Sequence, residues 1–217
     1  MRSHIKKFIL PIVLFCVFGL FSASLLFVDR QPIGPSGSVV GFATVNGFFR
    51  DLIGTHSTWY TATDVLGKAT FIVVGLFALL GLGQCIARRN PLRVNKDILA
   101  MAGFYVVVGV FYILFEFVIV NYRPVLMEGV LEASYPSSHT MLACCILGSA
   151  IVWFYKNLKK GAPRTVLCIE FSLLIAVMVV GRLLSGVHWF TDIVGGVLLS
   201  LALVSLYNAV IDILPRK

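Results

Sequence analysis

Three short polar segments interrupt the apolar sequence of this chain, and each holds residue types that do chemistry. They are residues 121–124, 135–139 and 182–192. Arg123 and Arg182 are permanently charged and offer forked N–H donors, which suit an oxyanion such as phosphate. His188 and Asp192 are four positions apart, so on a helix they share a face where the carboxylate orients the imidazole. The free ring nitrogen then attacks an electrophile. His139, in the middle segment, is a candidate proton donor to a leaving oxygen.

Two serines in the middle segment add a possible anion site. Ser137 and Ser138 follow Pro136, at a position where a helix is expected to begin. The start of a helix offers unpaired backbone N–H groups and the positive end of the helix dipole, and both favour an anion. We therefore expect both serines to help bind phosphoryl oxygens.

The composition indicates that these residues lie in a membrane protein. Hydrophobic residues make up 59% and charged residues 13% of the chain, against about 45–50% and about 25% in soluble domains. So few charges cannot cover the surface of a water-soluble fold, which disfavours a soluble enzyme, a disordered chain, a collagenous chain and a disulfide scaffold. The net charge of +8 comes with no recognisable nucleic-acid-binding module.

Six apolar stretches are long enough to cross a bilayer, which takes about 20 residues per helix. We expect spans at residues 8–28, 61–87, 98–120, 138–157, 165–183 and 190–211. Between the first two, apolar residues recur at roughly helical spacing within Asp29–Trp59, which predicts a short amphipathic helix at the membrane interface. A buried helix is the alternative. The predicted fold is all-α, a six-transmembrane-helix bundle forming one integral-membrane domain over residues 1–217.

The positions of the basic residues predict the orientation in the membrane. Thirteen of the eighteen lie on one side of the predicted spans: Arg2, Lys6, Lys7, Arg88, Arg89, Arg93, Lys96, Lys156, Lys159, Lys160, Arg164, Arg216 and Lys217. Basic residues gather on the cytoplasmic side of membrane proteins. We therefore expect both termini in the cytoplasm and all three polar segments at the extracytoplasmic face.

The spacing of the polar segments resembles the three-part signature of the type 2 phosphatidic acid phosphatase superfamily, which also includes the vanadium haloperoxidases. The matching residues are Arg123-Pro124, then Pro136-Ser137-Ser138-His139, then Arg182 followed by His188 and Asp192. The resemblance implies a six-helix membrane enzyme with its site at the outer face.

The resemblance also implies a role for each residue. His188 would be the nucleophile that forms a phosphohistidine, Asp192 would orient it, and His139 would protonate the leaving group. The phosphoryl oxygens would be bound by Arg123, Ser137, Ser138 and Arg182. No metal and no cofactor are implied.

The chain departs from the family pattern most clearly at Glu116. The family has a phosphate-binding lysine there, seven residues before the arginine of its first motif; Ser138 and Gly181 also replace the usual glycine and serine. On one continuous helix Glu116 would lie about 10 Å from Arg123, on the same side. We expect this carboxylate to pair with Arg123 or Arg182 and so modulate the site; partial protonation is the alternative.

The predicted function is a membrane lipid phosphatase acting on a lipid phosphate or pyrophosphate. Phosphatidylglycerol phosphate, phosphatidic acid and undecaprenyl pyrophosphate all fit, with membrane lipids as the other partners, and the compact chain predicts a bacterial inner membrane. One alternative is a phosphotransferase that passes the phosphoryl group to a lipid or sugar. Another is a non-catalytic lipid-binding or transport relative, although such a protein needs neither a nucleophile nor an acid.

Overall fold

A computed structural model describes residues 2–214 of the chain, with side chains from residue 5 onward. Within this range it contains seven α-helices: α1 (Arg2–Ser24), α2 (Ala43–Ile53), α3 (Ser57–Arg88), α4 (Lys96–Phe117), α5 (Ser138–Asn157), α6 (Ala162–Ser185) and α7 (Phe190–Ile213). Two short 3-10 turns, Pro35–Gly37 and Pro91–Arg93, lie in connections. Extended pairing in the described chain is limited to isolated bridges. The predicted all-α class is confirmed.

All of these helices except α2 are long and apolar enough to cross a membrane. The six-span prediction is therefore confirmed, and α2 is the short helix expected between the first two spans. Two spans end earlier than the apolar runs do, α1 at Ser24 and α4 at Phe117. After α1 only Leu25 is buried, whereas Leu26, Phe27 and Val28 are exposed. The carbonyl of Val28 accepts the N–H of Phe42 at 3.0 Å, which ties this segment to the start of α2.

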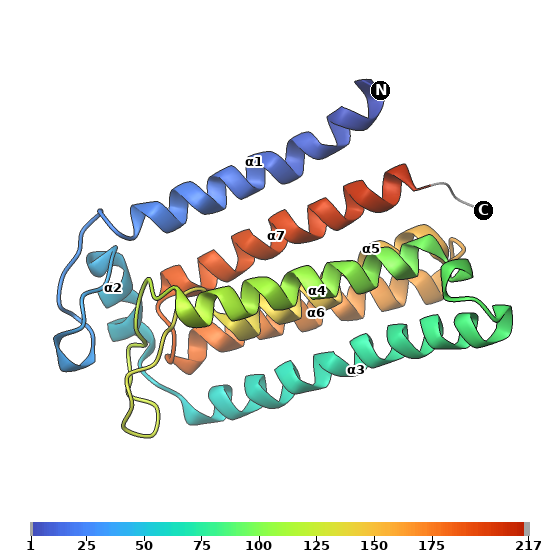
Figure 1. The fold of residues 1–217 in the computed structure, drawn as a ribbon. Helices are drawn as coiled ribbons and strands as arrows, with labels where there is room; N and C mark the ends of the chain where they lie inside the picture. The colour runs from blue at the N-terminus through green and yellow to red at the C-terminus, as the bar shows by residue number, and fades with distance from the viewer. Residues whose placement is uncertain (1, 215–217) are drawn as a thin grey trace.

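The spans lie side by side with α5 and α7 at the centre (Figure 1). α5 packs against α3, α6 and α7, while α1 packs along α7. α5 and α7 are the most buried spans, whereas the others turn many large apolar side chains outward. Outward-facing apolar side chains are the surface that a helix presents to lipid. The protein is an integral membrane protein.

The two ends of the bundle carry different features (Figure 1). The connections at residues 89–95 and 158–161 lie at the end where α1 begins and α7 finishes. There the ammonium of Lys7 donates to the carbonyl of Asp212 at 2.8 Å. The basic residues Arg2, Arg216 and Lys217, which entered the charge count, fall outside the described side chains. The opposite end carries α2 and the long 118–137 loop.

Candidate active site

The predicted site residues come together at the end of the bundle that carries α2 and the 118–137 loop. Each is supplied by a different part of the chain: Arg123 by the loop, His139 by the first turn of α5, Arg182 by the last turn of α6, His188 by the turn before α7, and Asp192 by the first turn of α7. The chain thus gathers these residues through the ends of three spans and two connections.

His188 is the centre of this group and is only 5% exposed. Its Nε2 accepts a hydrogen bond from Nη2 of Arg182 at 2.9 Å and another from Nη1 of Arg123 at 3.4 Å. Burial, and then the charges of Arg123 and Arg182, lower the pKa of His188 well below its ordinary 6.5. The ring is therefore neutral at neutral pH, with a lone pair on Nε2, and a neutral imidazole is the nucleophilic form.

Ser134 connects His188 to Asp192. Because Nε2 of His188 accepts hydrogen bonds, Nδ1 carries the proton and donates it to the hydroxyl oxygen of Ser134 at 3.1 Å. That hydroxyl donates in turn to Oδ2 of Asp192. The two residues do not share a helix face as expected, because α7 begins at Phe190 and His188 precedes it. Their nearest charged atoms are 3.9 Å apart, so the serine supplies the closer link.

Asp192 is fully buried and surrounded by donors. The same Oδ2 accepts the backbone N–H of Trp189 at 2.8 Å, and Oδ1 accepts the amide of Asn121 at 3.4 Å. A carboxylate in the first turn of α7 also faces the positive end of the helix dipole. The carbonyl of Asp192 accepts the backbone N–H of Ser137 at 3.0 Å, so the beginnings of α5 and α7 are fixed to each other.

The two serines before His139 differ in access. Ser137 precedes α5 as expected, but no side chain caps the first turn of that helix. Its hydroxyl is buried and accepts a hydrogen bond from Thr140 at 3.0 Å. Ser138 is half-buried and lines a cavity. The uncapped beginning of α5 and the Ser138 hydroxyl are thus the parts of this segment that suit an anion.

The cavity beside His188 has a volume of about 470 Å³ and is bordered by Arg123, Ser134, Ser138 and His139. Arg182 is fully buried next to His188, where its Nη1 donates to Thr63 at 3.3 Å and its guanidinium lies over the ring of Tyr60.

Three nitrogens of the site are buried without a hydrogen-bond partner, namely Nε of Arg123, Nε of Arg182 and Nδ1 of His139. Only two other buried side-chain atoms among residues 5–214 share this state. Buried polar groups are rarely left unpaired unless they serve a function. These unpaired nitrogens are the kind of groups that could bind an anion.

The predicted pairing of Glu116 with an arginine is wrong. Glu116 lines the cavity, but it forms an ion pair with neither Arg123 nor Arg182. Nε of Arg123 instead lies 3.1 Å from Oε2 of Glu132, as an ion pair without hydrogen-bond geometry. The prediction required one continuous helix, but α4 ends at Phe117 and the loop carries Arg123 in another direction.

Ser134 and Asp64 belong to the site and were not predicted. Ser134 directly precedes the middle polar segment, so its position at that edge was a weak signal. Asp64 lies inside a predicted span, 3.3 Å from His139. An ionisable residue within a span is itself a sign of function, and this was the signal that could have identified Asp64.

The turn that holds His188 is shaped by Gly186. Gly186 ends α6 with a φ of 68°, a left-handed conformation that favours glycine. A Cβ atom there would also collide with the backbone of Gly54 and Thr55. The backbone N–H of His56 donates to the carbonyl of Ser185 at 3.1 Å, which holds the start of α3 against this turn.

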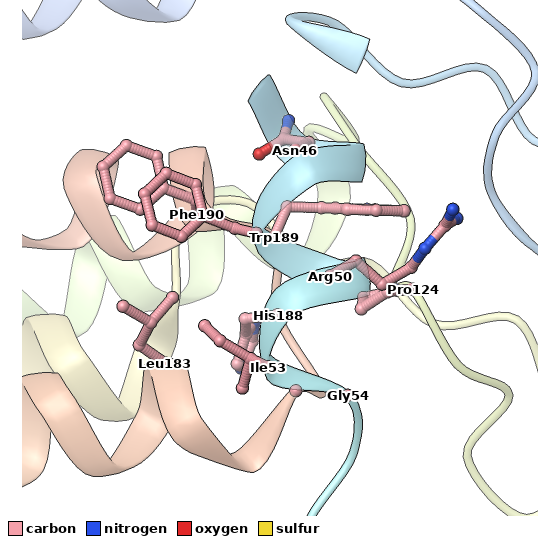
Figure 2. Close-up of a pocket in the computed structure, with 11 residues that line it drawn as sticks. Asn46, Arg50, Ile53, Gly54, Pro124, Leu183, His188, Trp189 and Phe190 are labelled. Carbon is pink, nitrogen blue, oxygen red and sulfur yellow. The ribbon is translucent and has the colours of Figure 1, made fainter. Parts of the chain in front are cut away.

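Helix α2 covers the other side of His188, as Figure 2 shows. The rings of Phe49 and Phe190 stack with centroids 4.1 Å apart, and the guanidinium of Arg50 lies over Trp189. The space left between α2 and this turn is about 10 Å³, room for roughly one water molecule. His188 is therefore approached from the side of the larger cavity.

A second cavity of about 510 Å³ lies between α3, α4 and α5. Most of its lining is apolar, including Phe71, Val108 and Leu142. It shares Ser138 and His139 with the first cavity, so an apolar compartment and a polar one meet at the beginning of α5.

Comparisons with known proteins bear on the family and the fold. The family model of the PAP2 superfamily matches residues 70–214, which is more than half of the chain. No match is found among curated proteins. Among solved structures, a transmembrane PAP2-type phosphatidylglycerolphosphate phosphatase from Bacillus subtilis has a similar fold, with a TM-score of 0.63 and 18% identity over 95% of this chain and 98% of that one. The chain belongs to the PAP2 superfamily.

Proposed function

We propose that this protein is a membrane lipid phosphatase that hydrolyses a lipid phosphate or pyrophosphate through a phosphohistidine on His188. The observation that carries the proposal is the meeting of two guanidinium groups at Nε2 of His188, 2.9 and 3.4 Å away. A phosphoryl group bound by Arg123 and Arg182 would hold its phosphorus beside a neutral ring nitrogen. Fixed positive charges at this place stabilise the charge that develops on the phosphoryl oxygens.

The proposed reaction has two steps. In the first, the lone pair on Nε2 of His188 attacks phosphorus, and the bond to the leaving oxygen breaks with its electron pair. His139 gives its proton to that oxygen, while the Nδ1 proton of His188 stays hydrogen-bonded to Ser134. In the second step water attacks phosphorus, the P–N bond breaks, and neutral His139 accepts a proton from the water. A lipid phosphate yields phosphate and a lipid alcohol. A lipid pyrophosphate yields phosphate and a lipid monophosphate.

The apolar cavity supports a lipid as substrate. It shares the lining residues Ser138 and His139 with the polar cavity, an arrangement that suits a molecule with a charged head and an apolar tail. The B. subtilis protein of similar fold is a phosphatidylglycerolphosphate phosphatase. Phosphatidylglycerol phosphate, phosphatidic acid and undecaprenyl pyrophosphate are the substrates to compare first.

The proposed chemistry uses no metal ion and no cofactor. Positive charge comes from two guanidinium groups, which attract the phosphoryl group and repel a divalent cation from the same place. We place this site at the extracytoplasmic face of a bacterial inner membrane, with both termini in the cytoplasm. The distribution of basic residues supports that orientation.

The test is release of inorganic phosphate from these three lipids by the purified full-length protein in detergent. We expect turnover by the wild type and by His56→Asn, a matched histidine variant at the same end of the bundle. His188→Asn should lose turnover and also lose the acid-labile, base-stable phosphoryl label that the wild type acquires from radiolabelled substrate. Activity should persist in a chelator.

Each part of the proposal has its own contrary result. Full activity of His188→Asn rules out the phosphohistidine. Strict dependence on a divalent metal rules out the metal-free reaction. Transfer of label to a lipid or sugar with no free phosphate identifies a phosphotransferase. Lipid binding without turnover by the wild type identifies a non-catalytic relative.

A further inference from the structure

His139 has a carboxylate partner on a helix that carries none of the family motif residues. Nε2 of His139 lies 3.3 Å from Oδ1 of Asp64 on α3. The other carboxylate oxygen, Oδ2, accepts a hydrogen bond from the ammonium of Lys68 at 2.7 Å. Asp64 and Lys68 both precede residue 70, where the match to the family model begins. Two consecutive contacts therefore connect the exposed Lys68 through Asp64 to His139 in the site.

The packing of α3 brings this carboxylate against the ring. A Cβ atom at Gly67 would lie 2.7 Å from Cδ2 of His139, so only glycine lets the imidazole lie this close to α3. The side chains of Asp64 and His139 are 26% and 28% exposed, whereas that of Lys68 is 76% exposed. The contact between Asp64 and His139 is thus partly shielded from water, which strengthens it.

The surrounding charges explain why a carboxylate is useful here. A general acid must carry its proton until the leaving oxygen develops charge. The guanidinium groups of Arg123 and Arg182 meet at the neighbouring His188, and positive charges there disfavour a proton on His139. Asp64 carries the opposite charge, and its Oδ1 lies 3.3 Å from Nε2 of His139. It therefore opposes the effect of the two arginines.

We propose that Asp64 is a positioning residue for the acid His139, and that Lys68 fixes the carboxylate of Asp64. The inference deepens the proposed phosphatase function and rests on it. In the protonated ring, Nε2–H donates to Asp64. The other ring nitrogen, Nδ1, is buried and has no hydrogen-bond partner in the described protein, so its proton is available for the leaving oxygen.

His139 gives up one proton in the first step and regains one in the second. As the bond from phosphorus to the leaving oxygen breaks, that oxygen takes the Nδ1 proton of His139. The ring becomes neutral and keeps its Nε2–H bond to Asp64, which remains ionised throughout. In the second step the same Nδ1 accepts a proton from the attacking water and restores the imidazolium.

The experiment compares two phosphate esters in the wild type and in Asp64→Asn. The leaving oxygen of short-chain phosphatidic acid needs a proton, whereas that of nitrophenyl phosphate leaves without one. We expect kcat for phosphatidic acid to fall about 10–100-fold, the effect of losing a hydrogen bond to a charged group, with little change for nitrophenyl phosphate. Asp97→Asn is the matched control, because Asp97 accepts a hydrogen bond from Trp153 at the far end of the bundle.

A second comparison asks whether Asp64 acts through His139. In a His139→Ala background, Asp64→Asn should have no further effect on either ester. A merely structural role predicts the opposite, namely equal losses for both esters that persist in that background. This result would overturn the inference while wild-type turnover still upheld the phosphatase. Absence of wild-type turnover on every ester would instead reject the proposed function together with the inference.

Lys68→Met provides a variant whose folding is not in doubt, because the Lys68 side chain is exposed. It should reproduce the selective loss on phosphatidic acid at a smaller size, with kcat rather than KM carrying the change. Equal effects on the two esters would show that Lys68 does not act through the acid. Should Asp64→Asn fail to fold, this variant decides the question.

Discussion

His188 is buried beside two arginines, and this environment keeps its imidazole unprotonated at neutral pH. Its lowered pKa links this residue to the stability of the whole protein. Below about pH 6.5 the unfolded chain binds a proton on this histidine that the folded chain does not bind, so stability falls as the pH drops. Above that pH neither state binds the proton, and the effect vanishes.

We therefore predict that the melting temperature of the wild type falls more steeply than that of His188→Asn between about pH 6.5 and about pH 5. One proton corresponds to about 1.4 kcal/mol per pH unit. Thermal unfolding in one detergent across this range provides the measurement. Parallel curves for the two proteins would show that His188 titrates in the folded state as it does in the unfolded chain.

Ser134 is the second residue whose environment yields a prediction. Ser134→Ala removes the link between His188 and Asp192 and leaves the buried Nδ1–H of His188 without its hydrogen-bond partner, while Asp192 keeps the N–H of Trp189. A buried hydrogen bond of about 1–3 kcal/mol predicts a decrease in kcat of roughly 10–100-fold. Ser205→Ala, which removes a serine hydroxyl from the far part of α7, should leave kcat unchanged. Equal kcat values for the two variants would mean that Asp192 orients His188 without the serine.

Residue types predicted part of this site and could not predict the rest. His188, Asp192 and the two arginines stand out because charged side chains are rare in apolar sequence. Ser134 does not stand out, since a serine near a helix start is ordinary. Its role exists only because folding places its hydroxyl between residues 188 and 192. The roles assigned to the predicted residues remain predictions until activity is measured.

At the scale of elements, close contact between α3 and α5 determines where the His139 ring lies. Gly67→Ala should displace that ring or separate the two helices, and a shift of about 1 Å can reduce turnover about 100-fold. Gly75→Ala on the same helix meets no atom within 4 Å and should keep full turnover. Steady-state kinetics on the preferred lipid would test this pair. Undiminished activity in Gly67→Ala would show that the ring adapts.

The helices themselves were largely predictable, and their ends were not. A run of about 20 apolar residues identifies a span because lipid requires such a run. The same composition continues beyond α4, where residues 118–120 are apolar but lie in a loop. Val118 and Ile119 are exposed, as lipid-facing residues of a span are, so composition alone does not show where the helix ends. The pairing predicted for Glu116 is wrong for the same reason, because it requires α4 to continue as far as Arg123.

In the whole molecule, the six spans separate two ends of the bundle, which we expect to lie on opposite sides of the membrane (Figure 1). Val130 lies in the loop at the end with the site, and Lys159 lies in a connection at the other end; both are exposed. In a protein without its five native cysteines, Val130→Cys should react with an impermeant thiol reagent on intact cells. Lys159→Cys should react only after lysis. The reverse pattern would invert the orientation and place the site on the cytoplasmic side.

The two hydrogen bonds from Arg123 and Arg182 to Nε2 of His188 also have a consequence for chemical selectivity. In this arrangement the guanidinium groups cover the lone pair of the most reactive nitrogen in the site. An electrophile without negative charge, such as an acylating reagent, has no anionic oxygens to bind the arginines. The two guanidinium groups then stay on Nε2 and shield it. A phosphoryl group carries oxygens that can draw both arginines away from the nitrogen as it arrives. In the proposed reaction, the phosphoryl group would thus expose the nitrogen that receives it.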